Sequence, residues 1–173
     1  VEGCEDIESL LIEVQEAKTN KKILAELIQR SLKIKRSMVE IDEFDTGPRR
    51  VFNYGHTFGH ALEAASNFSV PHGIAVAYGI DLANIISSEL GLISIDLRNQ
   101  VRPVLNEIWD ICPIPSFDID NYFVALMKDK KNTATELMLI FPVGEKAEIQ
   151  RVAVPPDSEF KSQCQKFMKI LQA

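Results

Sequence analysis

The chain has 173 residues, of which 46% are hydrophobic and 25% charged, so it is long enough for one compact domain with a hydrophobic core. Its net charge of -6 argues against a general nucleic-acid or membrane surface, because those partners are bound by extended basic fields. The longest apolar stretch, at 74–86, is too interrupted for a membrane span and the N-terminus is too acidic for a secretory signal, so we expect a cytoplasmic protein.

The first half of the chain predicts helices joined by one loop. At 6–18 and 20–39, apolar residues recur every three or four positions, as in amphipathic helices. The segment 40–50 is acidic and contains a Thr-Gly-Pro sequence at 46–48, which breaks this periodicity and predicts a loop. We expect a third helix to begin near Asn53.

The second half predicts further helices and one β-hairpin. A fourth helix should begin just after Pro71 and end before Gly91, and it is apolar nearly all round, which is typical of a buried central helix. The sequence predicts a mainly α fold, a single multi-helical domain with a small hairpin, and not the strand and helix alternation of a dinucleotide-binding fold. The remaining predicted elements are helices at 96–111, 118–127 and 156–171 and strands at 137–142 and 147–154.

All three histidines, His56, His60 and His72, lie within seventeen residues. On a helix, His56, His60 and Glu63 would share one face, and His72 would open the buried fourth helix. Neutral imidazole is a common zinc ligand, and a catalytic zinc usually has three protein ligands. The spacing alone therefore favours a three-histidine metal site. A surface pair with an unrelated histidine at a helix start would give the same spacing.

The cysteines and the basic residues also bear on the kind of site. Three cysteines are widely separated and lack CxxC spacing, so we interpret them as small apolar residues and not as disulfides or metal ligands. Basic residues form three local groups in an acidic chain; such groups are usually solvated faces, but they could instead converge on one anion. The cysteines are Cys4, Cys112 and Cys164, and the basic groups are Lys33, Lys35 and Arg36; Arg49 and Arg50; and Lys128, Lys130 and Lys131.

Four segments carry recognisable motifs. The sequence NYGHTFGHALE at 53–63 is followed by PHGIAVAYG at 71–79. An acidic DEFDTGPR segment at 42–49 precedes them, and DKKN at 129–132 follows them. In this order they resemble the motifs of the 3-dehydroquinate synthase family, within the sugar phosphate cyclase superfamily.

The resemblance implies that residues 1–173 form the C-terminal metal- and substrate-binding domain, with the N-terminal NAD-binding domain absent from this chain. The implied reaction converts 3-deoxy-D-arabino-heptulosonate 7-phosphate to 3-dehydroquinate and phosphate, in the shikimate pathway of aromatic amino acid biosynthesis. The resemblance also implies that His56 and His72 are ligands of Zn²⁺ or Co²⁺, with a glutamate from the preceding domain as the third ligand. His60 then has a role in positioning or transferring substrate protons.

The resemblance also implies how an anionic sugar phosphate is held. Arg49 matches the family's substrate-binding arginine, and Lys35 lies where the family has a substrate lysine. Asn53 matches a phosphate-binding asparagine, although an asparagine here could instead be a helix N-cap. Lys130 or Lys131 supplies a further positive charge.

Two positions depart from the family pattern. Ile74 and Asp45 stand where the family usually has glutamates, which would fit a divergent synthase or a related cyclase such as 2-deoxy-scyllo-inosose synthase. A non-catalytic helical metal-binding domain or a metal-dependent alcohol dehydrogenase would also fit the clustered histidines. The intact enzyme is expected to form a homodimer, and the isolated chain is expected to be inactive.

Overall fold

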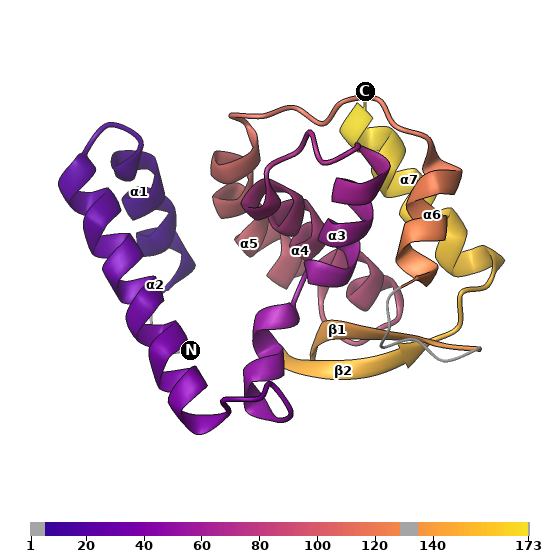
Figure 1. Cartoon of the computed structure of the whole chain (residues 1–173), viewed down its shortest axis with the longest axis horizontal. Helices are drawn as coiled ribbons and strands as arrows, with labels where there is room; N and C mark the ends of the chain where they lie inside the picture. The colour runs from indigo at the N-terminus through magenta and orange to yellow at the C-terminus, as the bar shows by residue number, and fades with distance from the viewer. Residues whose placement is uncertain (1–5, 129–134, 173) are drawn as a thin grey trace.

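The structure, a computed structural model, describes residues 6–128 and 135–172. It is mainly helical, with one two-stranded sheet, as predicted (Figure 1). The elements in chain order are α1 (Ile7–Ala17), α2 (Lys21–Ile41), the 3-10 helix η1 (Pro48–Asn53), α3 (His56–Ala65), α4 (His72–Glu89), α5 (Ile95–Trp109), α6 (Ile119–Met127), β1 (Leu137–Val143), β2 (Glu148–Val154) and α7 (Ser158–Gln172).

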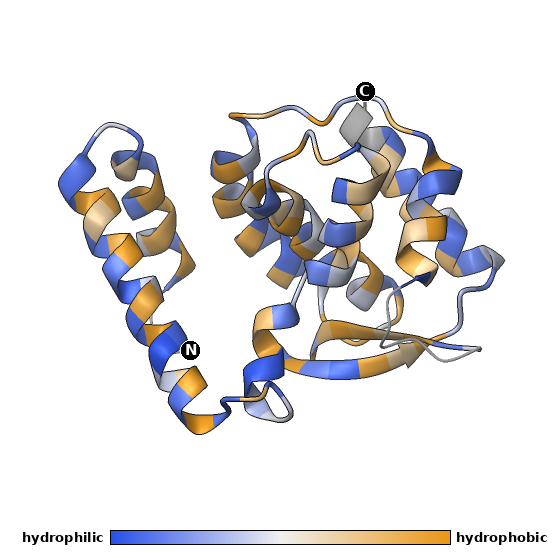
Figure 2. Cartoon of the chain, viewed as in Figure 1, coloured by the Kyte–Doolittle hydropathy of each residue, from blue (hydrophilic) through white to orange (hydrophobic). Residues whose placement is uncertain are grey.

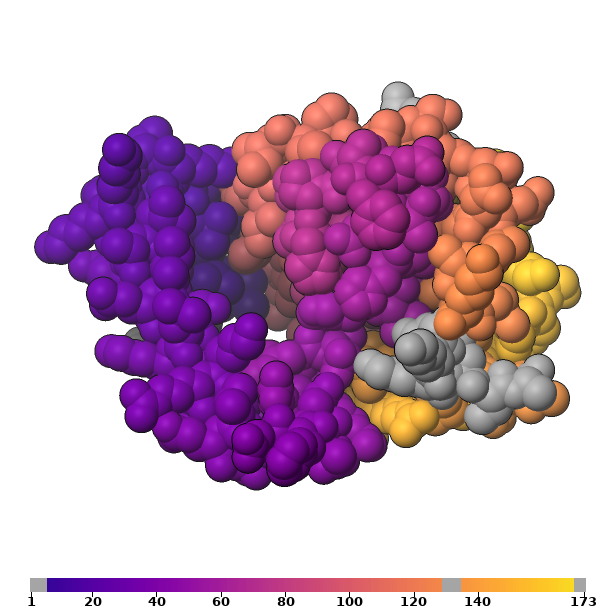
Figure 3. Space-filling model, viewed as in Figure 1, coloured from indigo at the N-terminus to yellow at the C-terminus, as the bar shows by residue number. Residues whose placement is uncertain are grey.

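Helices α1 and α2 form an antiparallel hairpin beside the rest of the molecule. Asp6 caps α1 by accepting a hydrogen bond from the backbone N–H of Ser9, and Asn20 caps α2 in the same way. Helix α1 packs against α5, whereas α2 contacts α1 and η1. In the space-filling view the hairpin is the indigo lobe (Figure 3).

Helix α2 is amphipathic but contributes no buried residue to the core. Hydrophobic residues occur along its length (Figure 2). Leu24, Ile28 and Leu32, spaced by four residues, remain between 44% and 60% exposed. The helix is therefore attached to the fold by one side only.

Helix α4 is the centre of the core, as its apolar sequence predicts, and it lies very close to α3. Glycines make this approach possible. A Cβ built on Gly79 would lie 2.0 Å from the carbonyl oxygen of Gly55 and 2.8 Å from the backbone nitrogen of Gly59. Gly55 itself has a φ of +76°, the left-handed conformation that favours glycine. The short distance between the two helices depends on these residues.

A buried ion pair joins α4 to α5. The carboxylate of Asp81 is fully buried and accepts hydrogen bonds from Nε and Nη2 of Arg98 at 2.9 and 3.0 Å. Arg102 lies 4.0 Å from the same carboxylate. A two-point arginine–carboxylate contact fixes orientation as well as compensating buried charge, so it sets how α5 lies along α4.

The two strands form an antiparallel hairpin in which Leu137 pairs with Val154 and Ile140 pairs with Arg151. Alternate residues of a strand point to opposite faces. The fully buried Leu137, Leu139 and Phe141 belong to the core cluster, and β1 packs against α4. Met138, Ile140 and Arg151 lie on the opposite face, toward η1.

Two details differ from the sequence prediction. The predicted loop at 40–50 is shorter, because α2 continues to Ile41 and η1 begins at Pro48, a residue suited to the first turn of a helix. The third helix begins at His56 and not near Asn53, because the left-handed Gly55 separates η1 from α3. The other helices and both strands are confirmed to within a few residues.

Two cysteines fall within the described residues, and both are free thiols. Cys164 is fully buried, and burial raises the pKa of its thiol. Cys4 lies outside the described residues. No helix within 6–128 and 135–172 combines the length and hydrophobicity needed to cross a membrane.

Candidate functional site

The three histidines form one cluster. His56 and His60 lie one turn apart on α3, and His72 is the first residue of α4. Their ring centroids are 5.5 Å apart for His56 and His60, 5.3 Å for His56 and His72, and 5.6 Å for His60 and His72. On the other face of α3, Phe58 and Leu62 are buried. The helix thus packs by its apolar side and presents its imidazoles outward.

Two of the three imidazoles are oriented by an oxygen acceptor at Nδ1. The Nδ1 atom of His56 is 3.2 Å from the backbone carbonyl of Tyr54, and that of His72 is 3.2 Å from a carboxylate oxygen of Glu63. An acceptor at Nδ1 favours the tautomer with its proton there, so Nε2 carries the lone pair. Metal-binding histidines are commonly oriented in this way.

Glu63 adds a possible ligand that the sequence prediction did not assign. Among the described residues, ligand atoms of His60, Glu63 and His72 lie within 4.8 Å of one another. The signal was present in the sequence, because Glu63 lies three residues after His60 and therefore on the same helix face. The structure therefore groups His60, Glu63 and His72 as possible ligands, whereas the resemblance implies His56 and His72. Both sets include His72.

The loop between α2 and η1 is folded around one carboxylate. Asp42 is buried and accepts hydrogen bonds from the backbone N–H groups of Thr46, Gly47 and Arg49 at 3.0, 2.7 and 3.1 Å. The bond from the Thr46 backbone is the largest cause that lowers the pKa of Asp42, and the other two add to it. Asp42 therefore fixes the backbone from which Arg49 projects.

A pocket of about 540 Å³ lies between α2, η1 and the start of α3, and we call it the α2–η1 pocket. Its volume is within the range of small-molecule sites. Four of the residues predicted to act on substrate or metal line it together: Lys35, Arg49, Asn53 and His56. The other lining residues, which the sequence prediction missed, are Ser31, Ile34, Asp45 and Phe52.

The polar contacts around this pocket position two of its residues. Arg49 donates from Nη1 to the backbone carbonyl of Glu43 at 2.8 Å. Asn53 donates from Nδ2 to a carboxylate oxygen of Asp45 at 3.2 Å. The helix N-cap interpretation of Asn53 is wrong, because Gly55 occupies that position of α3.

The basic groups converge only in part. Lys35 and Arg49 line the same pocket, whereas Arg36 on α2 bonds Glu40 at 2.7 Å. His60 and His72 are absent from the pocket lining, but both rings are within 5.5 Å of His56, which belongs to it. Lys130 and Lys131 lie outside the described residues.

Comparison with known protein families shows to which family the chain belongs. The model of the 3-dehydroquinate synthase C-terminal domain matches residues 3–132, which is most of the chain. The chain belongs to this family. The match contains α1 to α6, and so every described residue of the histidine cluster and of the α2–η1 pocket.

Curated relatives of this 3-dehydroquinate synthase domain support the same family. The chain is 33% identical over 127 residues to the 3-dehydroquinate synthase of Sulfurovum sp. (strain NBC37-1), covering 73% of this chain and 36% of that protein. It is 34% identical over 139 residues to that of Corynebacterium diphtheriae, covering 79% and 38%. It is 35% identical over 153 residues to that of Sulfolobus acidocaldarius, covering 81% and 41%. The chain thus spans about two fifths of these relatives' length.

Solved structures share the fold. A 2-deoxy-scyllo-inosose synthase superposes with a TM-score of 0.70 at 25% identity, over 85% of this chain and 40% of that one. The 2-epi-5-epi-valiolone synthase of Streptomyces hygroscopicus, solved with NAD⁺ and Zn²⁺, superposes with a TM-score of 0.67 at 18% identity, over 92% and 46%. The mainly α fold of the family domain is therefore shown from structure as well as from sequence.

Proposed function

We propose that this chain is the metal- and substrate-binding domain of a 3-dehydroquinate synthase, which converts 3-deoxy-D-arabino-heptulosonate 7-phosphate to 3-dehydroquinate and phosphate. The observation that carries the proposal is the convergence of Lys35, Arg49 and Asn53 with His56 in one pocket. These groups supply two cations and one amide beside a candidate metal ligand. The sequence relatives named 3-dehydroquinate synthase support the choice of reaction.

In this proposal His56 and His72 hold the metal ion through Nε2. The contacts of their Nδ1 atoms with Tyr54 and Glu63 support this choice, because they orient both rings and set the tautomer that binds a metal. Zn²⁺ or Co²⁺ bound there would act as a Lewis acid on substrate oxygens. A third protein ligand would come from the parent protein's N-terminal domain.

His60 is assigned to substrate protons and not to the metal. Its ring lies 5.5 Å from that of His56 and 5.6 Å from that of His72, so it borders the same space. Its side chain is exposed, so the imidazole can reach a bound substrate as a proton donor or acceptor. The competing assignment uses His60 with Glu63 and His72 as the ligand set.

The substrate has a carboxylate and a phosphate, so its two ends need separate cationic contacts. Arg49 and Lys35 are proposed to bind it, since a guanidinium can hold a carboxylate or phosphate through two parallel bonds. Asn53 is proposed to contact the phosphate, with Lys130 or Lys131 adding charge. Asp45 holds the amide of Asn53 and so limits its rotation.

The rest of the reaction requires groups that we assign to the parent protein. NAD, which would oxidise a substrate hydroxyl and later return the hydride, is proposed to bind mainly to an N-terminal domain. The structure of a 2-deoxy-scyllo-inosose synthase complexed with carbaglucose-6-phosphate, NAD⁺ and Co²⁺ supports this combination of components in the fold. We also propose a homodimer and a chain that is inactive alone.

A related cyclase reaction is the second candidate, because the fold superposes well on 2-deoxy-scyllo-inosose synthase. The experiment that separates the two supplies the full-length parent with each substrate and measures released phosphate. The heptulosonate phosphate should be consumed, and glucose 6-phosphate, the sugar that carbaglucose-6-phosphate resembles, should not. Turnover of glucose 6-phosphate alone would replace the proposed reaction, and turnover of neither would favour a non-catalytic metal-binding domain.

A further inference from the structure

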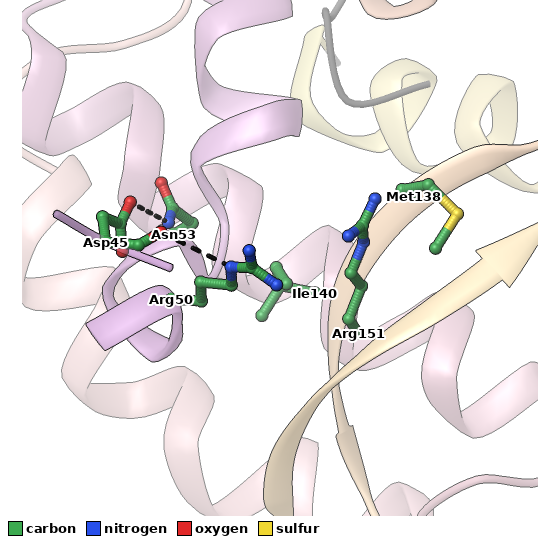
Figure 4. Close-up of a pocket in the computed structure, with 6 residues that line it drawn as sticks. All are labelled: Asp45, Arg50, Asn53, Met138, Ile140 and Arg151. Atoms are coloured by element: carbon green, nitrogen blue, oxygen red, sulfur yellow. Dashed lines mark hydrogen bonds between the residues drawn. The ribbon is translucent and has the colours of Figure 1, made fainter. Parts of the chain in front are cut away.

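A second, smaller pocket lies on the other side of η1, between that helix and the outward face of the β-hairpin (Figure 4). Its volume is about 140 Å³. An engineered cavity of similar size holds a benzene molecule, so there is room for one small ion. We call it the arginine pocket, and its lining residues are Asp45, Arg50, Asn53, Met138, Ile140 and Arg151.

The fold brings one arginine to each wall. Arg50 belongs to η1, and its guanidinium points from that helix toward the hairpin (Figure 4). Arg151 belongs to β2 and pairs across the ladder with Ile140, so both side chains stand on the same face of the hairpin. Two segments that are a hundred residues apart thus present the same chemical group to one hollow.

The acidic residue of this pocket does not neutralise Arg50. Asp45 directs one carboxylate oxygen to the amide of Asn53, and only its backbone carbonyl accepts a bond from Nε of Arg50, at 3.4 Å. No carboxylate within the described part of the chain forms an ion pair with Arg50. Two guanidinium groups and one carboxylate line the pocket.

The other lining residues favour an anion in this pocket. Met138 and Ile140 give the hairpin side of the pocket an apolar surface, and Ile140 is only 9% exposed. Charge interactions beside such a surface are screened less than in open water. An oxyanion with several acceptor oxygens can use guanidinium donors from both walls at once.

We propose that the arginine pocket binds free phosphate. Asp45 and Asn53 line both this pocket and the α2–η1 pocket, so the two are neighbours with a shared wall. The choice of phosphate among oxyanions rests on the proposed function, in which phosphate is released from the substrate. The arginine pocket would then receive the phosphate after it separates from the carbon skeleton.

The test is a calorimetric titration of inorganic phosphate into the purified protein and four single variants. Arg50→Gln and Arg151→Gln should each weaken phosphate binding about tenfold, the effect of losing one charge-assisted contact. Arg36→Gln removes the same charge from an exposed arginine on α2 and should leave the affinity unchanged. Thermal unfolding of each variant checks that the fold is retained.

The Arg49→Gln variant tests whether phosphate binds in the α2–η1 pocket instead. A parallel titration with glucose 6-phosphate tests whether the arginine pocket binds a phosphate ester. If only Arg49→Gln weakens phosphate binding, the ion uses the α2–η1 pocket and the proposed arginine pocket is wrong, although the proposed function stands. Equal affinities in all variants, or no measurable phosphate binding, would also overturn the inference. If Arg50→Gln and Arg151→Gln weaken only glucose 6-phosphate, the pocket binds a phosphate ester and not the free ion.

Discussion

Replacement of Gly79 by alanine tests whether the close approach of α3 and α4 is what holds the histidines together. The new Cβ would lie 2.0 Å from the carbonyl oxygen of Gly55, whereas ordinary contacts begin near 3.4 Å. The difference, 3.4 - 2.0 = 1.4 Å, must come from backbone movement, because the obstructing atoms are backbone atoms. His56 directly follows Gly55 and would move with it.

The expected loss of stability is the balance of two effects. Overpacking of this kind costs up to about 3 kcal/mol, while alanine is favoured over glycine in a helix by about 1 kcal/mol. A net loss of about 2 kcal/mol corresponds to a Tm decrease of about 4–8 °C in a chain of this size. The measurement is thermal unfolding followed by circular dichroism, together with a Co²⁺ titration that reports the geometry of the histidine cluster.

Gly73→Ala is the matched control, since Gly73 also belongs to α4 but a Cβ there meets nothing within 4 Å. This control should keep or slightly raise the Tm and should leave Co²⁺ binding unchanged. A Gly79→Ala variant as stable as Gly73→Ala, with the same Co²⁺ affinity, would refute the argument that glycine contacts set the distance between the two helices.

Three other predictions concern the site. In the proposed full-length enzyme, His56→Ala and His72→Ala should lose bound zinc, whereas His60→Ala should keep it and slow turnover about 10²- to 10⁴-fold. Equal zinc loss in His60→Ala, by metal analysis, would make His60 a ligand. Arg49→Ala should raise the KM about tenfold in steady-state kinetics, and an unchanged KM would argue against substrate contact. Because its pKa is lowered, the Asp42 carboxylate stabilises the fold above the ordinary carboxyl pKa of about 3.9, and this contribution is lost as the pH falls through the lowered value. Asp42→Asn should therefore show a smaller Tm decrease between pH 5 and pH 3 than the unmodified chain, and equal decreases would contradict this role.

Local signals were sufficient for most of the helices. Asp6, Asn20 and Asp118 precede apolar periodic segments and are N-caps in the structure. The near-continuous apolar sequence after Pro71 predicted the burial of α4, because only a helix covered on all sides can lack a polar face. In contrast, η1 was missed, because a 3-10 helix of six residues is too short to show a periodic pattern.

The site was less accessible to sequence reasoning than the fold. The motif at 53–63 predicted which face of α3 carries the imidazoles, and Lys35 and Arg49 were predicted to act together. The contact between Glu63 and His72 depends on how α3 crosses α4, which no local pattern encodes. The pairing of Arg50 with Arg151 across one hollow depends on the strand register and on the position of η1, so it could be found only in three dimensions.

Helix α2 combines two properties that bear on dynamics. It supplies Ser31, Ile34 and Lys35 to the α2–η1 pocket, yet it buries no residue of its own. Segments with few buried apolar contacts open at low free energy, so backbone amides of α2 should exchange with solvent much faster than those of α4. An anion that bridges Lys35 and Arg49 would slow that exchange by mass action. Its affinity therefore includes the free energy needed to keep one helix ordered.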